Sequence, residues 1–306
     1  MNIKKLFSAK GFLIFPAAVL VVYWVQMYVE GREIEMPVRG TFTLVTLGFI
    51  VLLELAFPYA KSVSQRTLLP RDVTSTLVHL WGTGVVVPAI FTPVLLFLPE
   101  IFFGRTLFFG NSAQLGPFWL QLVLVILFSS FLKYWIHRIQ HRVSFLWELH
   151  SYHHSVTDLR ASNALVSHPI DFGLRNVLPP VILAVVGFNP TAIVFGVGLL
   201  TVTGTFSHCG AGLHAGWLNK LFVTPELHRW HHSAKLPEGH KFSVNYGVGF
   251  ILWDRLFGTF YLPMKDGVPL QPDKLGHPDG IRDEGNYLKL LFLTRYWPKF
   301  LRPAKH

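Results

Sequence analysis

Two short stretches of the chain carry the same dense pattern of histidines. Residues 148–155 read ELHSYHHS, and residues 226–233 read ELHRWHHS. A third motif, HRIQH, places His137 and His141 four positions apart. Imidazole nitrogens bind zinc, copper, iron and nickel, so this repeated spacing indicates metal binding.

The histidines of each copy occupy positions i, i+3 and i+4, which lie on one face of a helix. We therefore expect each copy to form one ligand set of three residues, and HRIQH to add two more. Eight imidazoles directed at one region can hold two metal ions. These eight are His137, His141, His150, His153, His154, His228, His231 and His232.

The ligand types argue against two kinds of zinc protein. Structural zinc normally takes four ligands and usually includes cysteine, but the chain has one cysteine, Cys209, which we expect to be a packing residue. An HExxH motif is absent, so a zinc peptidase would lack its general base. Glu148 and Glu226 precede a histidine by two positions, and we expect both to start helices rather than to bind metal. A metal-handling or sensor protein stays open as an alternative to an enzyme.

The composition is that of a membrane protein. Of 306 residues, 51% are hydrophobic and 14% are charged, well outside the balance of a soluble domain. Four apolar runs are long enough to cross a bilayer: 11–29, 41–60, 73–98 and 115–136. The first is too long for a signal peptide, and no small-residue cleavage site precedes Glu30, so we expect an uncleaved anchor.

The net charge of +10 is first a signal of membrane topology. Basic residues gather in alternate loops: Lys4, Lys5 and Lys10, then Lys61, Arg66 and Arg71, then Lys133, Arg138 and Arg142. By the positive-inside rule, the N-terminus and the chain from His137 onward face the cytoplasm. The metals then lie at the cytoplasmic mouth of the bundle, whereas a transporter places its ligands at mid-membrane. No basic block with interleaved aromatic residues predicts nucleic-acid binding.

One further apolar region, 177–206, is interrupted by GFNPT at 187–191. This cluster of Gly, Asn and Pro breaks a helix. We expect a re-entrant hairpin of two half-length helices, because a single irregular span would leave the two histidine phrases on opposite sides of the membrane. After it, Thr224 and Pro225 predict the start of a short helix that carries the second phrase.

These residues resemble the sterol desaturase and fatty acid hydroxylase superfamily of integral membrane diiron enzymes. The similarity extends to SHPIDFGLRNVLPP from Ser167, to FSHCG, which contains His208, and to NYGVGFILWDRLFGTFYLP after the second phrase. It covers residues 131–263. The expected fold is all-α: a membrane bundle of about four transmembrane helices plus the re-entrant hairpin, with a cytoplasmic histidine-rich cap. Three parts are expected, with transmembrane helices in 1–114, the catalytic region in 115–263 and an interfacial tail in 264–306.

The resemblance implies nine metal ligands and several residues around them. The ligands are His137, His141, His150, His153, His154, His208, His228, His231 and His232. His214 is a further candidate ligand, and His168 a ligand or a residue that orients one. Asp171 and Asp254 are candidates for orienting ligand imidazoles, with salt bridges to Arg175 and Arg255 as the alternative.

The implied reaction uses two ferrous ions, dioxygen and electrons derived from NAD(P)H to hydroxylate an unactivated C–H bond of a membrane lipid, an acyl chain or a sterol-like molecule. Desaturation by the same kind of enzyme is the alternative. The chain has no flavin or nicotinamide motif, so the electrons must come from a separate protein, a ferredoxin or b-type cytochrome with its reductase. We expect the enzyme in a bacterial inner membrane, or in the endoplasmic reticulum if it is eukaryotic.

Overall fold

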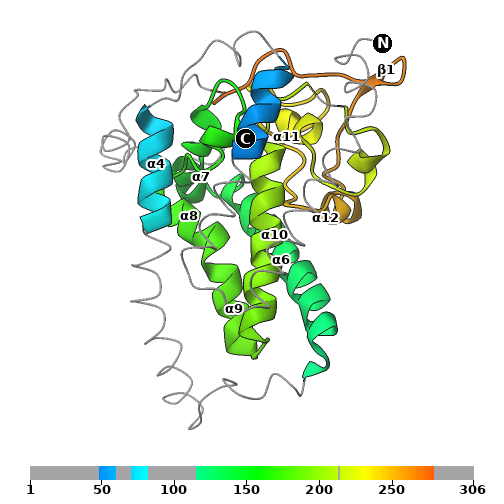
Figure 1. Ribbon diagram of the computed structural model, residues 1–306. Helices are drawn as coiled ribbons and strands as arrows, with labels where there is room; N and C mark the ends of the chain where they lie inside the picture. The colour runs from blue at the N-terminus through cyan, green and yellow to red at the C-terminus, as the bar shows by residue number, and fades with distance from the viewer. Residues whose placement is uncertain (1–47, 60–69, 82–114, 213, 279–306) are drawn as a thin grey trace.

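The computed structural model describes residues 48–59, 70–81, 115–212 and 214–278, and this part of the chain is mostly helical (Figure 1). The α-helices are α4 (Pro70–Trp81), α6 (Phe118–Gln140), α7 (Ser144–His150), α8 (Pro169–Asn176), α9 (Leu178–Val186), α10 (Pro190–Ser207), α11 (Pro225–His231), α12 (Leu252–Leu256) and a helix at 48–56. The 3-10 helices are η3 (His153–Ser155), η4 (Ala161–Asn163) and η5 (Gly216–Lys220). Strands β1 (Met264–Lys265) and β2 (Val268–Pro269) form a small antiparallel hairpin. The all-α prediction is confirmed.

The membrane character is also confirmed. Three helical segments are long and apolar enough to cross a bilayer: Phe118–Gln140, Pro169–Val186 and Pro190–Ser207. The predicted span at 11–29, parts of the spans at 41–60 and 73–98, and the end of the tail lie outside the described residues.

Helix α6 is shifted toward the C-terminus relative to the span predicted at 115–136: it begins at Phe118 and continues through His137 to Gln140. Its Lys133, which we expected in a cytoplasmic loop, is instead buried within the helix and donates a hydrogen bond to Asn176. Lys133 therefore carries no information about topology, a correction to the charge argument. His141 caps the C-terminal end of the helix.

The predicted helical hairpin is present, formed by α9 and α10. Gly187 adopts φ 101°, a left-handed conformation that glycine tolerates, and caps α9. The side chain of Asn189 accepts hydrogen bonds from the backbone N–H groups of Thr191 and Ala192, which starts α10. Because α8 and α9 follow one another directly, each arm has 18 residues, longer than the half-length helices expected.

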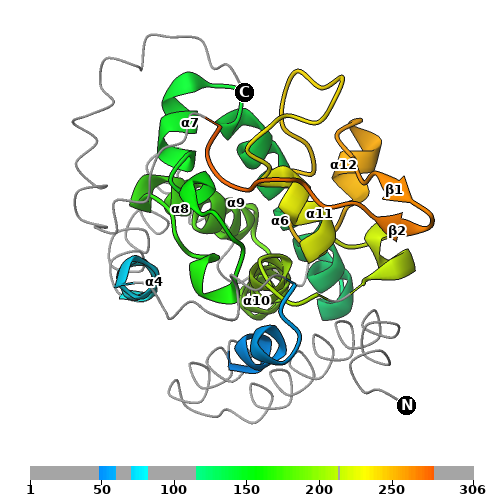
Figure 2. The ribbon, with the colours of Figure 1, turned by 90° about the horizontal axis from the view of Figure 1, so that it is seen from above.

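Helix α10 packs closely along α6, as both views of the ribbon show (Figures 1 and 2). Gly196 makes this approach possible, since a Cβ atom there would lie 2.7 Å from Cγ1 of Val125. Buried side chains of α6, α9 and α10, including Leu122, Leu183 and Phe195, fill the space between these helices. The turn of the hairpin lies at the lower end of Figure 1, and α7 and α11 lie toward the upper end.

Candidate metal centre

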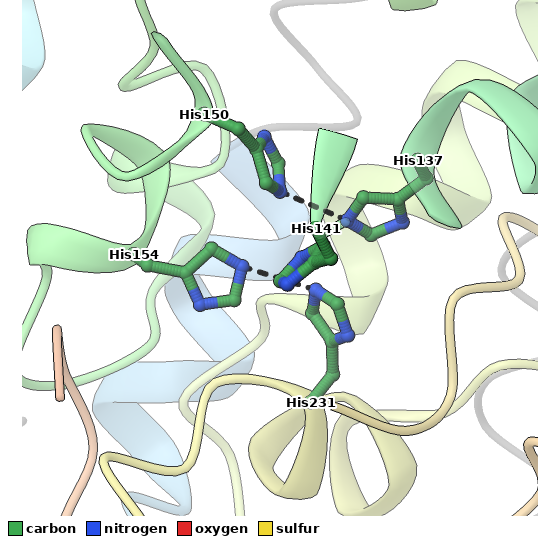
Figure 3. A group of neighbouring side chains, drawn as sticks. All are labelled: His137, His141, His150, His154 and His231. Carbon is green, nitrogen blue, oxygen red and sulfur yellow. Dashed lines mark hydrogen bonds between the residues drawn. The ribbon is translucent and has the colours of Figure 1, made fainter. Parts of the chain in front are cut away.

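The structure brings nine histidines together in two buried groups. The first group is His137, His141, His150, His154 and His231, and the second is His153, His208, His228 and His232. Within each group the candidate ligand nitrogens lie within 4.8 Å of one another. Figure 3 shows the first group, whose imidazoles converge from separate segments of the chain. These are the nine residues that the family resemblance implies, and their role as metal ligands stays a prediction.

Each histidine phrase contributes to both groups, which differs from the expectation that a phrase forms one ligand set. His150 and His154 join the first group, whereas His153 joins the second. The second phrase divides in the opposite sense: it gives the second group its positions i and i+4, and the first group His231. The two phrases differ in local structure: His150 ends α7 and the next two histidines lie in η3, whereas the second phrase lies in α11 and its C-cap. Each phrase nevertheless contributes to both groups, so two phrases supply two ligand clusters in place of one.

The distances between imidazoles fit a shared metal ion. Four pairs of Nε2 atoms face one another at 3.0 Å (His137 and His150), 3.1 Å (His154 and His231), 3.2 Å (His153 and His208) and 2.9 Å (His208 and His228). Two ligands at right angles around a metal, each with a metal–nitrogen bond of about 2.1 Å, are about 3.0 Å apart. The observed spacing is the one expected of adjacent ligands.

The opposite edge of most of these rings is held by the protein. Three Nδ1 atoms face a backbone carbonyl: His137 faces Tyr246 (2.8 Å), His153 faces Val166 (3.1 Å) and His231 faces Val244 (2.8 Å). Two face a side-chain oxygen: His150 faces Asp171 Oδ1 (3.0 Å) and His208 faces Asn163 Oδ1 (3.3 Å). Each partner atom is an acceptor, so Nδ1 carries the hydrogen and donates it. That tautomer leaves the Nε2 lone pair free to bind a metal.

His232 gives an independent indication that something is bound here. Both of its ring nitrogens are buried without a hydrogen-bond partner, and so is Nδ1 of His228. A buried polar atom with no partner costs about 1–3 kcal/mol, and native proteins rarely leave one. A metal ion in the second group would bind one of the two His232 nitrogens, so the donor set fits the metals that the family resemblance implies.

Burial keeps these imidazoles neutral, which is the form that binds metal. Desolvation lowers the pKa of His153, His154, His228 and His232 well below the ordinary value. The pKa of His231 falls to about 3, as does that of His208, again mainly through burial. At neutral pH the metal does not have to displace protons from these side chains.

Acidification is expected to release the metal. In the unfolded chain a histidine takes a proton near pH 6.5, whereas in the folded chain His208 and His231 resist protonation until about 3. The stability that these neutral side chains contribute is therefore fully present above about pH 6.5 and is lost as the pH falls toward about 3. Metal retained after desalting at stepwise lower pH should be constant above neutrality and fall steeply within this window. Retention of all metal at the acid end of the window would contradict the assignment.

Asp171 anchors the first group from behind. One carboxylate oxygen accepts hydrogen bonds from His150 Nδ1 (3.0 Å) and from Gln140 Nε2 (2.7 Å), and the other accepts from Arg175 (2.8 Å). The two roles weighed for Asp171, orienting an imidazole and pairing with Arg175, are thus both present. A carboxylate behind a ligand histidine fixes the orientation of its ring and strengthens its basicity.

Asp254 supports the centre indirectly. It accepts hydrogen bonds from the backbone N–H groups of Tyr246 (2.7 Å) and Gly247 (2.8 Å) and from the Thr259 hydroxyl. Tyr246 in turn presents its carbonyl to His137. Burial raises the pKa of Asp254 to about 6. The alternative salt bridge to Arg255 is not formed; the Arg255 guanidinium lies over the ring of Phe260.

Two further candidate ligands lie outside both groups. Nδ1 of His168 accepts the backbone N–H of Ile170 and so caps α8, which makes it a helix-start residue. His214 is half exposed and pairs with Glu226 at 2.9 Å. Glu226 lies in the first turn of α11, as expected, and it is buried. It also binds Ala215 and Asn219, so it fastens the 214–219 segment to that helix.

Several residues around the centre carry no signal in the sequence. Asn163 and Gln140 bond to His208 and Asp171, but amide side chains are common and their spacing to the histidines follows no pattern. The carbonyls of Val166 and Val244 could not be found from sequence either, because every residue has one. Cys209 is fully buried in an apolar cluster, and burial raises the pKa of its thiol to about 12, so the packing role is confirmed.

A small cavity of about 70 Å³ lies beside the second group. His137, His153, His208 and His228 contribute to its wall, together with residues of α6, α8 and α10. These helices belong to the segments that can cross the membrane. The candidate metal centre is therefore next to a space bounded by helices that are long and apolar enough to cross a membrane.

Comparison with known proteins agrees with this arrangement. The family model described as fatty acid hydroxylase matches residues 122–259. An ornithine lipid hydroxylase of Rhizobium tropici is 29% identical over 85% of this chain and 78% of its own length. Fatty acid hydroxylase domain-containing protein 2 of Homo sapiens is 32% identical over 55% of this chain, and a Delta(7)-sterol 5(6)-desaturase of Gibberella zeae 26% over 57%. The chain spans 46% and 52% of the length of these last two relatives. No solved structure matches the chain.

Proposed function

Because this chain belongs to the sterol desaturase and fatty acid hydroxylase superfamily, we propose that it is a membrane-bound diiron oxygenase that hydroxylates a C–H bond of a lipid. The observation that carries the proposal is the pair of buried histidine groups beside a cavity between membrane-spanning helices. Its relatives include an ornithine lipid hydroxylase.

The ligand set supports iron better than zinc. The first group offers five imidazoles, one more than the four ligands that a zinc site normally uses, neither group includes a thiolate, and imidazole is a good ligand for iron. Two iron ions would supply the reduction of dioxygen and the removal of hydrogen from an unactivated C–H bond, chemistry that protein side chains lack.

The protein itself would hold the metal ions, orient the imidazoles that bind them and exclude water from the site. The nine imidazoles are the proposed ligands, and the Nδ1 partners fix five of their rings. All nine are at most 5% exposed, so bulk water is kept from the reacting atoms. The cavity beside the second group is lined by residues of α6, α8 and α10, and we propose that the reacting part of the lipid enters it.

Desaturation is the second candidate reaction, favoured by the sterol desaturase among the relatives. Removal of a second hydrogen in place of oxygen transfer gives an alkene, and the outcome depends on small differences in substrate position. The relative that aligns over 85% of this chain is a hydroxylase, and this favours hydroxylation.

The membrane arrangement and the electron donor are also part of the proposal. The metal centre faces the cytoplasm of a bacterial cell, where a ferredoxin or a b-type cytochrome with its reductase can deliver electrons derived from NAD(P)H. Arg138 and Arg142, at the end of α6, support docking of an acidic donor protein on this side.

Lipid analysis in heavy dioxygen tests the function. Lipids from native cells with and without the gene are compared by mass spectrometry after growth in isotopically labelled dioxygen. We expect one lipid to gain a labelled oxygen atom only when the gene is present. A gene-dependent loss of two hydrogen atoms would identify a desaturase. If neither change occurs while the protein binds metal reversibly, the metal-handling alternative holds.

A further inference from the structure

Lys133 is a buried basic side chain that the metal centre does not account for. Its side chain lies in α6, a membrane-spanning helix, and is 3% exposed. Its amino group donates one hydrogen bond, to Asn176 Oδ1 at 2.8 Å. Among the described residues no carboxylate pairs with it. Burial disfavours the charged form of an amine that has no counter-ion, so an anion that entered here would stabilise the protonated side chain and be bound by it.

The position of Lys133 directs it toward the reaction site. Lys133 and His137 are four residues apart on α6, so they lie on the same face, about 5–6 Å apart along the helix. Both contribute to the wall of the cavity, as does Asn176. An anion bound to Lys133 would therefore occupy the same small space that the histidines face.

The rest of the cavity wall leaves the charge unbalanced. Arg175 also lines the cavity, and one of its nitrogens, Nε, is buried without a partner. Its carboxylate partner Asp171 lies behind the histidines and does not line the cavity. Two basic side chains and no carboxylate thus line this space, and metal ions bound to neutral imidazoles would add positive charge.

The size of the cavity limits what can enter. At about 70 Å³ it is far smaller than the roughly 300–1,000 Å³ of typical pockets for whole ligands. It has room for a carboxylate or phosphate and a few attached atoms, but not for a folded acyl chain. The remainder of a lipid would have to lie outside, along the membrane-spanning helices.

From these observations we infer that Lys133 and Asn176 form a subsite for the carboxylate or phosphate of the lipid substrate. The C–H bond that is hydroxylated then lies within a few bonds of this anionic group, and not far along an acyl chain. This inference rests on the proposed function, which it deepens by naming the substrate class: lipids with an anionic group next to the reacting carbon.

Binding of matched amphiphiles tests the subsite. The full-length, metal-loaded protein is studied in neutral detergent without reductant, so that no turnover occurs, and the displacement of a fluorescent fatty acid is measured. Dodecanoate and dodecyl phosphate are compared with dodecanol, which has the same chain but no charge. We expect the two anions to bind at least about tenfold more tightly, since a hydrogen bond between charged groups contributes more than a neutral one.

Substitutions of Lys133 test whether this residue causes the preference for anionic amphiphiles. Lys133→Met, similar in length but uncharged, should remove the preference for the anions, and Lys133→Arg should retain it. Lys265→Met, an exposed change on β1, removes one positive charge elsewhere and should leave the preference unchanged. Metal content and circular dichroism show whether each variant is folded.

Three results would overturn the inference: no preference in the wild-type protein, an equal preference in folded Lys133→Met, or competition by inorganic phosphate as strong as that by dodecyl phosphate. The last would identify a site for free anions. Since no reaction is needed, failure of this test with intact hydroxylation refutes the subsite alone. A positive result without oxygen transfer refutes the proposed function alone.

Discussion

Replacing His232 by alanine is expected to lower the yield of oxidised lipid by about 100-fold or more and to reduce the metal content from two ions to about one. His232 is fully buried, and neither of its ring nitrogens has a partner in the protein. Without a metal, such a side chain would only be destabilising. Its removal should therefore empty the second group while the first keeps its five histidines.

The matched control is His240→Ala. His240 lies outside both groups and bonds only locally, to the carbonyl of Glu238. This change should leave metal content and product yield as in the wild-type protein. Full metal content in His232→Ala, measured by elemental analysis of the purified protein, would contradict the assignment of the second group.

Asp171→Asn is expected to weaken metal binding in the first group by about 10–100-fold, although Asp171 is not itself a proposed ligand. The neutral amide cannot offer acceptor oxygens to His150, Gln140 and Arg175 at once. His150 would lose its fixed tautomer and orientation. The rate at which a chelator removes metal should rise in this variant, with one of the two ions lost first.

Arg175→Met separates orientation of the ligand from stability. It breaks the buried ion pair with Asp171 but leaves the Asp171–His150 contact in place. Breaking such a pair costs about 3–5 kcal/mol, so this variant should unfold at lower temperature yet release metal to the chelator at nearly the wild-type rate. If both variants release metal equally fast, Asp171 acts through stability and not through His150.

Much of the centre could be predicted because the histidines are regularly spaced within short segments of the sequence. The triplets at His150 and His228 and the pair at His137 combine a rare residue with a helical period, and no packing requirement explains that combination. The hairpin could be predicted for a similar reason, since Gly187 and Pro190 break a helix whatever surrounds them.

What could not be predicted depends on contacts between distant segments. The division of each phrase between two groups arises from how α11 packs against the segment that carries His153 and His154. The local sequence of either segment does not specify that packing. By its place in the sequence Lys133 resembles a charge that flanks a span, because the residue that it bonds to, Asn176, lies 43 residues away. His208 has no neighbouring histidine at helical spacing, so it was identified from the family resemblance alone.

The most direct test of the account is to locate the metals in the purified, full-length protein by anomalous X-ray scattering at the iron absorption edge. The account predicts two iron ions, one among His137, His141, His150, His154 and His231 and one among His153, His208, His228 and His232. A single ion, or an ion bound by other residues while either group holds none, would contradict it.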